Sequence, residues 1–230
     1  MLELAMTLAI LVLIVVVIVP LLRASANRAE DFRCETSLRR GVFDFTVFAR
    51  ESGASGFTLE RFVQSMYGVG EYWAHEGDMQ TRVEAREVFG CAAEPSQLTL
   101  DGREDCLLKQ VGPSSGVSYG FNARLARAEL PGGVGRGGTA PVRLDRSVFG
   151  LGRAPLVWDI DGAEAGRRGV IAHFSAPAIR DEAFYGDGRR WFPARRHGGA
   201  VYAGFLDGSV GSSADPLRES GWSWSAQTIE

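Results

Sequence analysis

The hydrophobic pattern of this chain changes sharply after residue 22. Residues 4–22 carry no charged side chain and a single hydroxyl, that of Thr7. A helix of this length rises roughly 28 Å, enough to cross the hydrocarbon core of a bilayer. The stretch lacks the basic start, the short apolar run and the small-residue cleavage site of a secretory signal peptide. We therefore expect residues 1–22 to form a transmembrane helix that stays on the mature protein.

Beyond residue 22 the apolar positions become periodic. Leu38, Val42, Phe45 and Ala49 recur at helical spacing within an otherwise charged segment. This pattern predicts that residues 23–50 continue the helix in amphipathic form, with one apolar stripe. Such a stripe needs a sheet or a partner to cover it. Gly53-Ala-Ser-Gly56 is expected to end the helix.

The remainder, residues 51–230, favours short elements. A second helix is expected after Thr58, a candidate N-cap, with an apolar side made of Leu59, Phe62, Val63 and Met66. Strands are expected at residues 117–122, 155–160, 170–174 and 200–206. Asp161-Gly162 should close the second of these strands, and residues 130–138 should form a flexible loop.

A hairpin is the clearest signal near the C-terminus. Asp207-Gly208 separates the run 200–206 from Ser209-Val210. Asp-Gly between strand-like runs predicts a two-residue hairpin in which both turn positions have positive φ. The chain is therefore predicted to be α+β, with a long N-terminal helix packed on a small antiparallel sheet in the head domain.

Composition narrows the functional class. Without the apolar helix about 200 residues remain, enough for one domain with a core. The 29 glycines and nine prolines favour turns and strands there. The net charge of −3 argues against nucleic acid as a partner.

Three cysteines allow at most one internal disulfide bond. Cys91 and Cys106 enclose a short loop and form the natural pair in an oxidising compartment. Cys34 is expected to be a packed thiol on the helix.

Glu3 and Pro20 stand near the two ends of the apolar run, 17 residues apart. This arrangement resembles the N-terminal helix of type IV pilins and pseudopilins. Their mature chain starts Phe-Thr-Leu-Ile-Glu-Leu, and their Glu-to-Pro spacing is the same; Leu2-Glu3-Leu4 matches the end of that start. The resemblance implies that Glu3 pairs with the N-terminal ammonium of a neighbouring subunit during assembly. It also implies that Pro20 lets the helix bend or melt locally.

The flanking charges bear on orientation. Arg23, Arg28 and Arg33 follow the apolar run, and no basic residue precedes it. By the positive-inside rule this would leave the C-terminal side in the cytoplasm. A basic leader ahead of Met1, as the pilin family has, would restore the opposite orientation. If Met1 is the true start, the helix is a signal anchor that a prepilin peptidase cannot process.

Three further motifs follow in order along the chain. They are Cys34-Glu-Thr-Ser-Leu38-Arg39-Arg40, Ser118-Tyr119-Gly120-Phe-Asn122, and Arg196-His197-Gly198-Gly199 with Phe205-Leu-Asp207-Gly208. Nine residues separate His197 from Asp207. As a set they resemble a bacterial group of pseudopilin-like proteins, a domain family of unknown function with an H-X9-DG signature. The first motif departs from the family pattern at Ser37 and Arg40, and Cys91-Ala-Ala-Glu-Pro95 matches the family's Cys-Pro segment loosely.

Taken together, the resemblances imply a structural subunit without enzymatic activity or cofactor. Before assembly it would rest in the inner membrane as a single-pass protein with a periplasmic head. Its partners would be other pilin or pseudopilin subunits, an inner-membrane assembly platform and the lipid bilayer. The secretion system or pilus that it serves is left open.

His197 and Asp207 have two interpretations. In the structural one, Asp207 makes the hairpin turn and His197 hydrogen-bonds a loop. In the functional one, His197 forms a metal or ligand site with Asp159 or Asp161. We expect no metal, because no closely spaced run of calcium ligands is present.

A different class of function is also open. Gly112-Pro-Ser-Ser-Gly116 fits G-x-S-x-G, and Asp159 with His173 or His197 follows Ser114 in the order of an α/β-hydrolase. The strand-like run after Gly116 and the absence of alternating helices argue against a catalytic Ser114. Trp222 and Trp224 are interpreted as packing or surface aromatics, with a carbohydrate platform left open. The alternative function is thus an anchored extracytoplasmic ligand-binding or hydrolase domain that does not polymerise.

Overall fold

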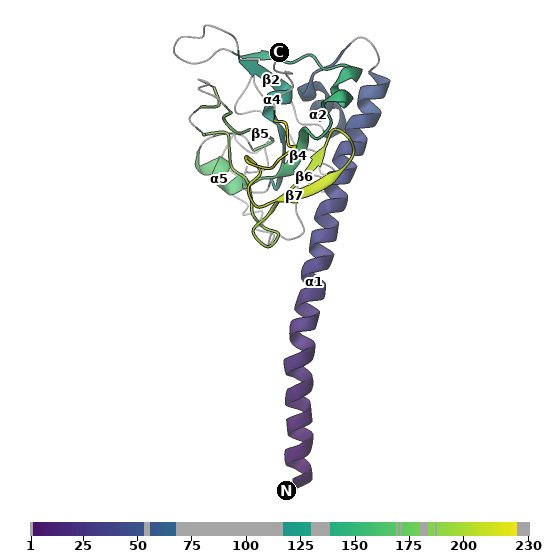
Figure 1. The fold of residues 1–230 in the computed structure, drawn as a ribbon, viewed down its shortest axis with the longest axis vertical. Coiled ribbons are helices and arrows are strands. Elements are labelled where there is room, and N and C mark those ends of the chain that lie inside the picture. The colour runs from purple at the N-terminus through teal and green to yellow at the C-terminus, as the bar shows by residue number, and fades with distance from the viewer. Residues whose placement is uncertain are drawn as a thin grey trace, which may run out of the picture.

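The computed structural model describes residues 2–52, 56–67, 117–129, 139–168, 170, 172–179, 184–186 and 188–224. Element labels follow Figure 1. The chain is α+β, as the sequence predicts, with a long N-terminal helix beside a head that contains a mainly antiparallel sheet.

Helix α1 (Leu2–Glu51) runs unbroken for 50 residues and continues as helix through Pro20. Its N-terminal half projects from the head, and its C-terminal half lies along one side of it (Figure 1). Within the described part of the chain, one helix, over Ile10–Glu51, is long and apolar enough to cross a membrane. The rest of the protein buries none of the most apolar stretch of this helix. The local melting expected at Pro20 is absent from this helix.

The central sheet has five strands in the order β5-β1-β4-β6-β7. Their bounds are β1 Tyr119–Asn122, β4 Pro155–Asp159, β5 Phe174–Ser175, β6 Val201–Phe205 and β7 Val210–Ser213. Strands β1, β4, β6 and β7 pair antiparallel, and β5 joins β1 in parallel. Helix α1 lies against β4, β6 and β7.

Short elements surround this sheet. They are α2 (Leu59–Tyr67), α4 (Ala123–Ala126), β2 (Arg127–Glu129), β3 (Thr139–Pro141), the 3-10 helix η3 (Arg146–Leu151) and α5 (Gly162–Arg167). Strands β2 and β3 pair antiparallel as a separate two-stranded sheet.

The predicted apolar stripe is the contact between α1 and the head. Leu38, Val42, Phe45 and Ala49 are all buried. The approach is close at Gly204 of β6, where an added Cβ would lie 2.7 Å from Val42 Cγ2 and 3.3 Å from the Leu38 carbonyl oxygen. The absence of a side chain at Gly204 therefore sets how closely the helix and the sheet pack.

The predicted second helix is confirmed, with one change on its apolar side. Thr58 caps α2, since its hydroxyl accepts a hydrogen bond from the Arg61 N–H at 3.2 Å. Tyr67 is buried, whereas Met66 is 40% exposed. The buried face of α2 packs edge-to-face through Phe62 onto Phe45 of α1 and Phe121 of β1. The two helices and the sheet thus share one aromatic core.

The two C-terminal tryptophans pack against the head. Trp224 is buried and donates its indole N–H to the Pro216 carbonyl at 3.0 Å. Its ring lies 4.0 Å, centroid to centroid, from that of Trp158 in β4. Trp222 is partly buried against Phe205, with ring centroids 4.9 Å apart. The packing interpretation is therefore confirmed for both.

The prediction of a two-residue turn at Asp207-Gly208 is wrong. The 206–208 turn is a three-residue loop, because Gly208 N donates to the Phe205 carbonyl and Phe205 N donates to that of Ser209. Gly208 has φ +89°, but Asp207 does not have positive φ. In a three-residue loop of this kind only the last residue needs positive φ, and glycine adopts it without steric cost. Asp207 therefore avoids the strain of a positive φ. Asp161-Gly162 follows the end of β4, as predicted, and also starts α5, since the Asp161 carboxylate accepts from the Glu164 N–H.

The expected loop at 130–138 lies outside the described residues. The expected strand 170–174 is reduced to β5 at Phe174–Ser175.

Candidate functional site

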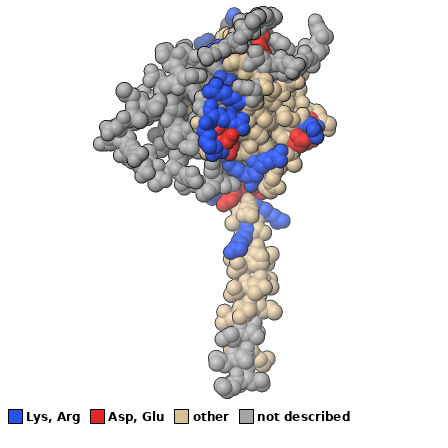
Figure 2. Space-filling view, turned by 90° about the vertical axis from the view of Figure 1, so that its left-hand side faces the viewer, with Lys and Arg blue, Asp and Glu red and all other residues tan. Residues whose placement is uncertain are grey.

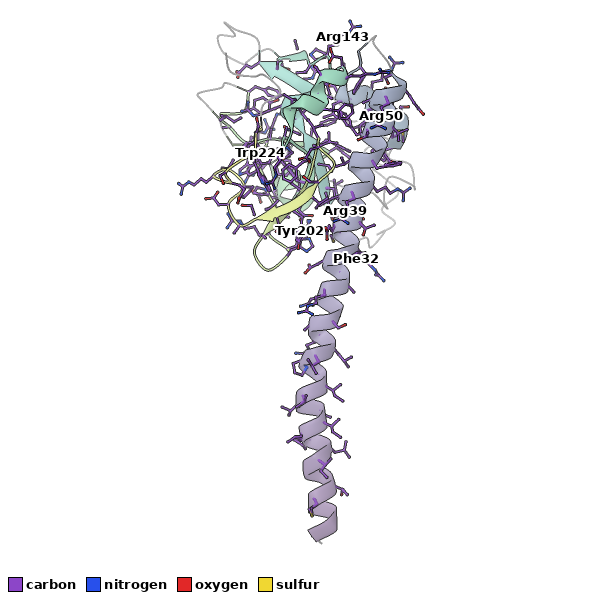
Figure 3. All side chains as sticks on the ribbon, turned by 45° about the vertical axis from the view of Figure 1, so that its right-hand side comes forward. Phe32, Arg39, Arg50, Arg143, Tyr202 and Trp224 are labelled. Carbon is purple, nitrogen blue, oxygen red and sulfur yellow. The ribbon has the colours of Figure 1, made fainter. Side chains whose placement is uncertain are left out.

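Residues from separate sequence motifs meet where α1 enters the head. His197, in the segment before β6, lies between Asp31 of α1 and Asp159 at the end of β4. Tyr202 of β6 lies beside α1 at the same level, between Phe32 and Arg39 (Figure 3). We call Asp31, Asp159 and His197 the junction triad.

Each ring nitrogen of His197 faces a carboxylate. His197 Nδ1 lies 2.6 Å from Asp31 Oδ1, and Nε2 lies 3.3 Å from Asp159 Oδ2. The side chain of His197 is 1% exposed and that of Asp159 is fully buried, whereas that of Asp31 is 41% exposed. The triad is therefore shielded from solvent on the sheet side, at Asp159, and partly exposed to solvent on the helix side, at Asp31.

The glycines after His197 have a geometric role. Gly198 and Gly199 have φ of +61° and +90°, and the Ala200 N–H donates to the His197 carbonyl at 3.1 Å. A turn with positive φ at both central positions is accessible mainly to glycine. The turn leads directly into β6, which fixes His197 relative to the sheet.

Asp159 is held from the neighbouring strand. The Tyr202 N–H donates to Asp159 Oδ2 at 2.9 Å, and the Tyr202 ring stands edge-on to that of His197 at 4.6 Å. The second oxygen, Asp159 Oδ1, is buried without a hydrogen-bond partner in the part of the chain that is described. A buried carboxylate needs a nearby positive charge, and His197 is placed to supply it.

The electrostatics of His197 follow from this setting. Burial alone lowers the pKa of its imidazole, but the hydrogen bonds and charges of Asp159 and then Asp31 outweigh burial. The pKa of His197 therefore lies above its ordinary value. His173 contrasts with it, because full burial lowers the pKa of that imidazole to about 4.

The Ser118–Asn122 motif supports the same corner of the sheet. The Ser118 carbonyl accepts from the Ile160 N–H at 2.8 Å and from Arg196 Nη1 at 3.2 Å, and Arg196 Nη2 donates to the Ile160 carbonyl at 2.6 Å. Tyr119 is the register partner of Asp159. An added Cβ at Gly120 would lie 2.9 Å from the Ala172 carbonyl oxygen. The motif thus locks β1 to the strand end that carries Asp159.

Asn122 ends that motif in a structural role. Its amide nitrogen donates to the carbonyls of Pro155, at 2.9 Å, and Trp224, at 3.2 Å. Its oxygen caps α4 by accepting from the Arg124 N–H. Asn122 therefore ties the C-terminal segment to the centre of the sheet.

Other predicted residues lie apart from the triad. Asp207 serves the hairpin, since its carboxylate accepts from the Ser209 N–H at 2.9 Å. Arg39 is exposed and pairs with Glu35 one turn earlier at 2.6 Å. Pro20 is exposed on α1, and the side chain of Glu3 lies outside the described residues. Thus His197 and Asp207 have separate roles despite their shared motif.

Cys34 differs from its prediction. It is buried and disulfide-bonded, so the expectation of a free packed thiol is wrong. Cys91 and Cys106, the pair predicted to form a disulfide bond, lie outside the described residues. Helical spacing identified the position as buried, but it carried no information on a distant cysteine.

Asp31 is the triad member that sequence reasoning missed. It stands seven residues before Leu38, on the line of the apolar stripe. A carboxylate on a head-facing stripe needs a partner, and this was the available signal. Motif comparison could not give it, because Asp31 belongs to none of the matched motifs.

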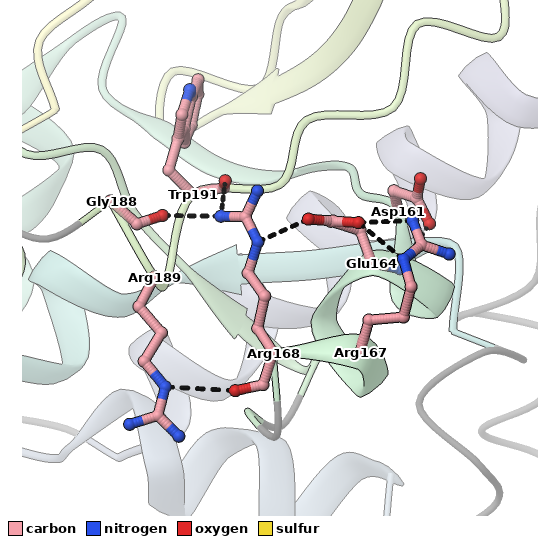
Figure 4. Close-up of polar contacts among 7 residues, drawn as sticks. All are labelled: Asp161, Glu164, Arg167, Arg168, Gly188, Arg189 and Trp191. Carbon is pink, nitrogen blue, oxygen red and sulfur yellow. Dashed lines mark hydrogen bonds and ion pairs between the residues drawn. The ribbon is translucent and has the colours of Figure 1, made fainter.

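An arginine cluster on the head has an internal role (Figure 4). Arg167 and Arg168 both pair with Glu164 of α5. Arg168 also donates to the carbonyls of Gly188 and Trp191, at 2.8 and 2.9 Å, and Arg189 donates to the Arg168 carbonyl. Asp161 caps α5 beside them. These contacts hold the 188–191 segment on α5, and Asp161 does not join His197.

The triad contains two residues of the hydrolase hypothesis, Asp159 and His197. No group of three metal-binding side chains occurs in the described ranges. Ser114 lies outside them. Asp159 does meet His197, but a second carboxylate occupies the other ring nitrogen, and the sheet is mainly antiparallel. An α/β-hydrolase would instead place its serine after a strand of a parallel sheet.

Comparison with protein-family models, curated proteins and solved structures found no match to this chain.

Proposed function

We propose that the chain is a pseudopilin-like structural subunit of a type II secretion or type IV pilus-like assembly. Helix α1 carries this proposal. Its N-terminal half exposes apolar side chains all round, at Met6 and from Ile10 through Leu22, while its C-terminal half contributes the apolar stripe to the core of the head. A helix that is apolar on every side is stable in lipid or among other helices. One continuous rod can therefore serve as a membrane anchor before assembly and as a packing element afterwards.

The Cys34 disulfide bond supports a head outside the cytoplasm. Disulfide bonds form and persist in oxidising compartments such as the periplasm and are rare in the cytosol. Cys34 lies just beyond the apolar segment, on the side of the head. The proposal therefore places residues 23–230 on the periplasmic side of the inner membrane, against the direction that Arg23, Arg28 and Arg33 favour.

The exposed side of α1 also favours contacts with neighbouring subunits. Phe32 and Phe43 are 64% and 66% exposed. They stand 11 residues apart, so they share one side of the helix, roughly 130° from the buried stripe. Figure 2 shows the described part of the projecting helix without charged side chains up to the level just below the head, where basic side chains begin. Aromatic side chains on a bare helix face are typical of protein interfaces.

In this proposal Glu3 sets the register between subunits by pairing with a neighbour's terminal ammonium. Glu3→Ala should leave the protein inserted in the native membrane but lower its recovery in cross-linked oligomers and sheared filaments by at least about tenfold, the loss of one desolvated charge pair. Glu30→Ala is the matched control, because it removes an acidic residue from the same helix beyond the apolar segment. Normal recruitment of the Glu3→Ala protein would contradict the assigned role.

The competing function is an anchored ligand-binding or hydrolase domain that never polymerises. Intact-mass analysis and N-terminal sequencing of protein from its native membrane separate the two. A methylated N-terminus, with Phe-Thr ahead of Met1, supports a processed pseudopilin. An unmodified start at Met1, together with a monomeric wild-type protein after cross-linking, favours the anchored domain.

A further inference from the structure

Two kinds of contact join α1 to the head. Leu38, Val42, Phe45 and Ala49 supply an apolar contact along the upper part of the helix. The junction triad supplies a charged contact at the lower end, where Asp31 lies nearer the membrane segment than any residue of the stripe. Beside the apolar contact, Asp44 of α1 accepts a hydrogen bond from the Tyr67 phenol of α2 at 3.1 Å, and burial raises the pKa of that phenol, which stays neutral. A change in the charge of His197 therefore acts at the lower end.

The triad geometry requires a particular protonation state. A neutral imidazole has one N–H donor and one acceptor nitrogen, whereas an imidazolium has two donors. Both nitrogens of His197 face carboxylate oxygens, at 2.6 and 3.3 Å. With both carboxylates ionised, only the imidazolium can donate to each of them. A neutral ring would direct a lone pair at one carboxylate.

We propose that His197 is a proton-controlled latch that ties Asp31 of α1 to Asp159 of the sheet and releases α1 when it loses its proton. Only the contact with Asp31 is lost, and the contact with Asp159 is kept. Asp159 is fully buried and keeps the hydrogen bond from the Tyr202 N–H, so the remaining imidazole N–H stays with it. Asp31 is 41% exposed, and water can solvate it once the imidazolium is gone.

The other charged groups around His197 do not replace it. On α1, Glu35 pairs with Arg39. Arg196, next in sequence, donates to the Ser118 and Ile160 carbonyls. Burial raises the pKa values of Tyr119 on β1 and Tyr202 on β6, so both phenols stay neutral. Deprotonation of His197 therefore leaves two carboxylates facing a neutral ring.

Opening the latch would loosen the head on its stalk while the apolar stripe keeps the two together. The angle between head and helix would then depend on the pH of the compartment that holds the head. The latch stands on contacts within one chain, so it holds whether or not the protein polymerises.

Ring NMR on the full chain in detergent micelles tests the latch directly. The chain has three histidines, so His197→Gln assigns the His197 signals by their loss. We expect both ring nitrogens of His197 to carry protons at pH 6 and one of them to be lost above pH 6.5, the ordinary imidazole value. As that proton is lost, backbone amide exchange at residues 32–36, corrected for its intrinsic pH dependence, should rise roughly tenfold.

Asp31→Asn is the decisive variant, because it removes the exposed carboxylate and keeps the shape of the side chain. It should lower the pH at which His197 titrates and give the faster exchange at residues 32–36 already at pH 6. Glu35→Gln, one turn along on the same helix, should match the wild type in both readouts. The latch would be overturned by a singly protonated His197 at pH 6. The latch would also be overturned if amide exchange at residues 32–36 did not change as His197 titrates. Equal effects of Asp31→Asn and Glu35→Gln would overturn it too.

Discussion

At the scale of single residues, the packing of the head on α1 depends on one missing side chain. Gly204 lies under Val42 and the Leu38 carbonyl, where a Cβ has no room. The neighbouring contact is looser, since a Cβ at Gly41 of α1 would lie 3.5 Å from Val157 Cγ1. The tight point is therefore on the strand and not on the helix.

Gly204→Ala should lower the free energy of unfolding of the head by about 1–3 kcal/mol, the usual cost of overpacking a core. Gly150→Ala is the control, because an added Cβ at Gly150 meets nothing within 4 Å. Denaturant titration in micelles, followed by the fluorescence of the buried tryptophans, measures both. Equal stabilities of the two variants would show that α1 can shift away from β6 at Gly204 at little energetic cost.

The sequence could not predict these residue-scale features. Gly204 stands in an apolar run like any strand glycine, and its importance comes only from the helix that crosses it. His197 was identified by its motif, and Asp159 was one of the two aspartates considered as its partner, but Asp31 lies 166 residues away in the chain and was missed. Local patterns carry no information on such pairings, which are decided when the head closes on the helix.

At the scale of elements, α1 carries two different faces at nearly the same level. Phe45 is fully buried in the aromatic core, whereas Phe43, two positions earlier, is 66% exposed. The two residues differ in role because two positions turn a helix by roughly 200°. This contrast separates a core position from an exposed position within one turn of helix.

Phe45→Ala should destabilise the head by about 3–5 kcal/mol, because it leaves a cavity among Phe57, Phe62 and Phe149. Phe43→Ala should change stability by less than about 0.5 kcal/mol. If α1 packs against neighbouring subunits, Phe43→Ala should nevertheless lower the yield of cross-linked oligomers. Denaturation of the purified chains and cross-linking in native membranes give the two readouts. Full assembly of Phe43→Ala would exclude this side of the helix from the interface.

Elements with a local signal were the ones that the sequence predicted well. The continued helix, the capped α2, the buried β4 and the C-terminal hairpin all follow from periodicity, a cap or a turn dipeptide. The failures have a physical pattern. The hairpin loop has three residues, not two, which lets Asp207 avoid a positive φ. Strand β5 is short because it pairs with β1 only at Phe121 and Asn122. The disulfide of Cys34 depended on a distant partner.

At the scale of the whole molecule, two buried histidines act on stability in opposite directions. The pKa of His173 is about 6.5 in the unfolded chain and about 4 in the folded chain. Between these pH values His173 is protonated in the unfolded chain and neutral in the folded chain. Stability is then lost as the pH falls through that range. The pKa of His197 is raised, so its contribution is complete below about 6.5 and is lost as the pH rises through the folded-state value.

The difference between wild type and His173→Leu should isolate the acid side of this dependence. Relative to the variant, the wild type should lose about 3 kcal/mol of unfolding free energy between pH 6.5 and pH 4. Above pH 7 the two curves should run parallel, because His197 is common to both. Denaturant midpoints across this range in micelles provide the measurement, and a constant difference between the curves would refute a neutral buried His173.

The position of the stripe in the chain also has a consequence in time. The ribosome makes Leu38–Ala49 early, whereas β6 and β7, which cover this stripe, come last, beginning at Val201. At translation rates of 5–20 residues per second, roughly 10–30 s separate the two events. During that interval the stripe lacks the two strands that cover it in the folded protein. A nascent chain that stops before Val201 therefore cannot complete its head, and cellular chaperones and proteases would meet it with part of this apolar surface uncovered.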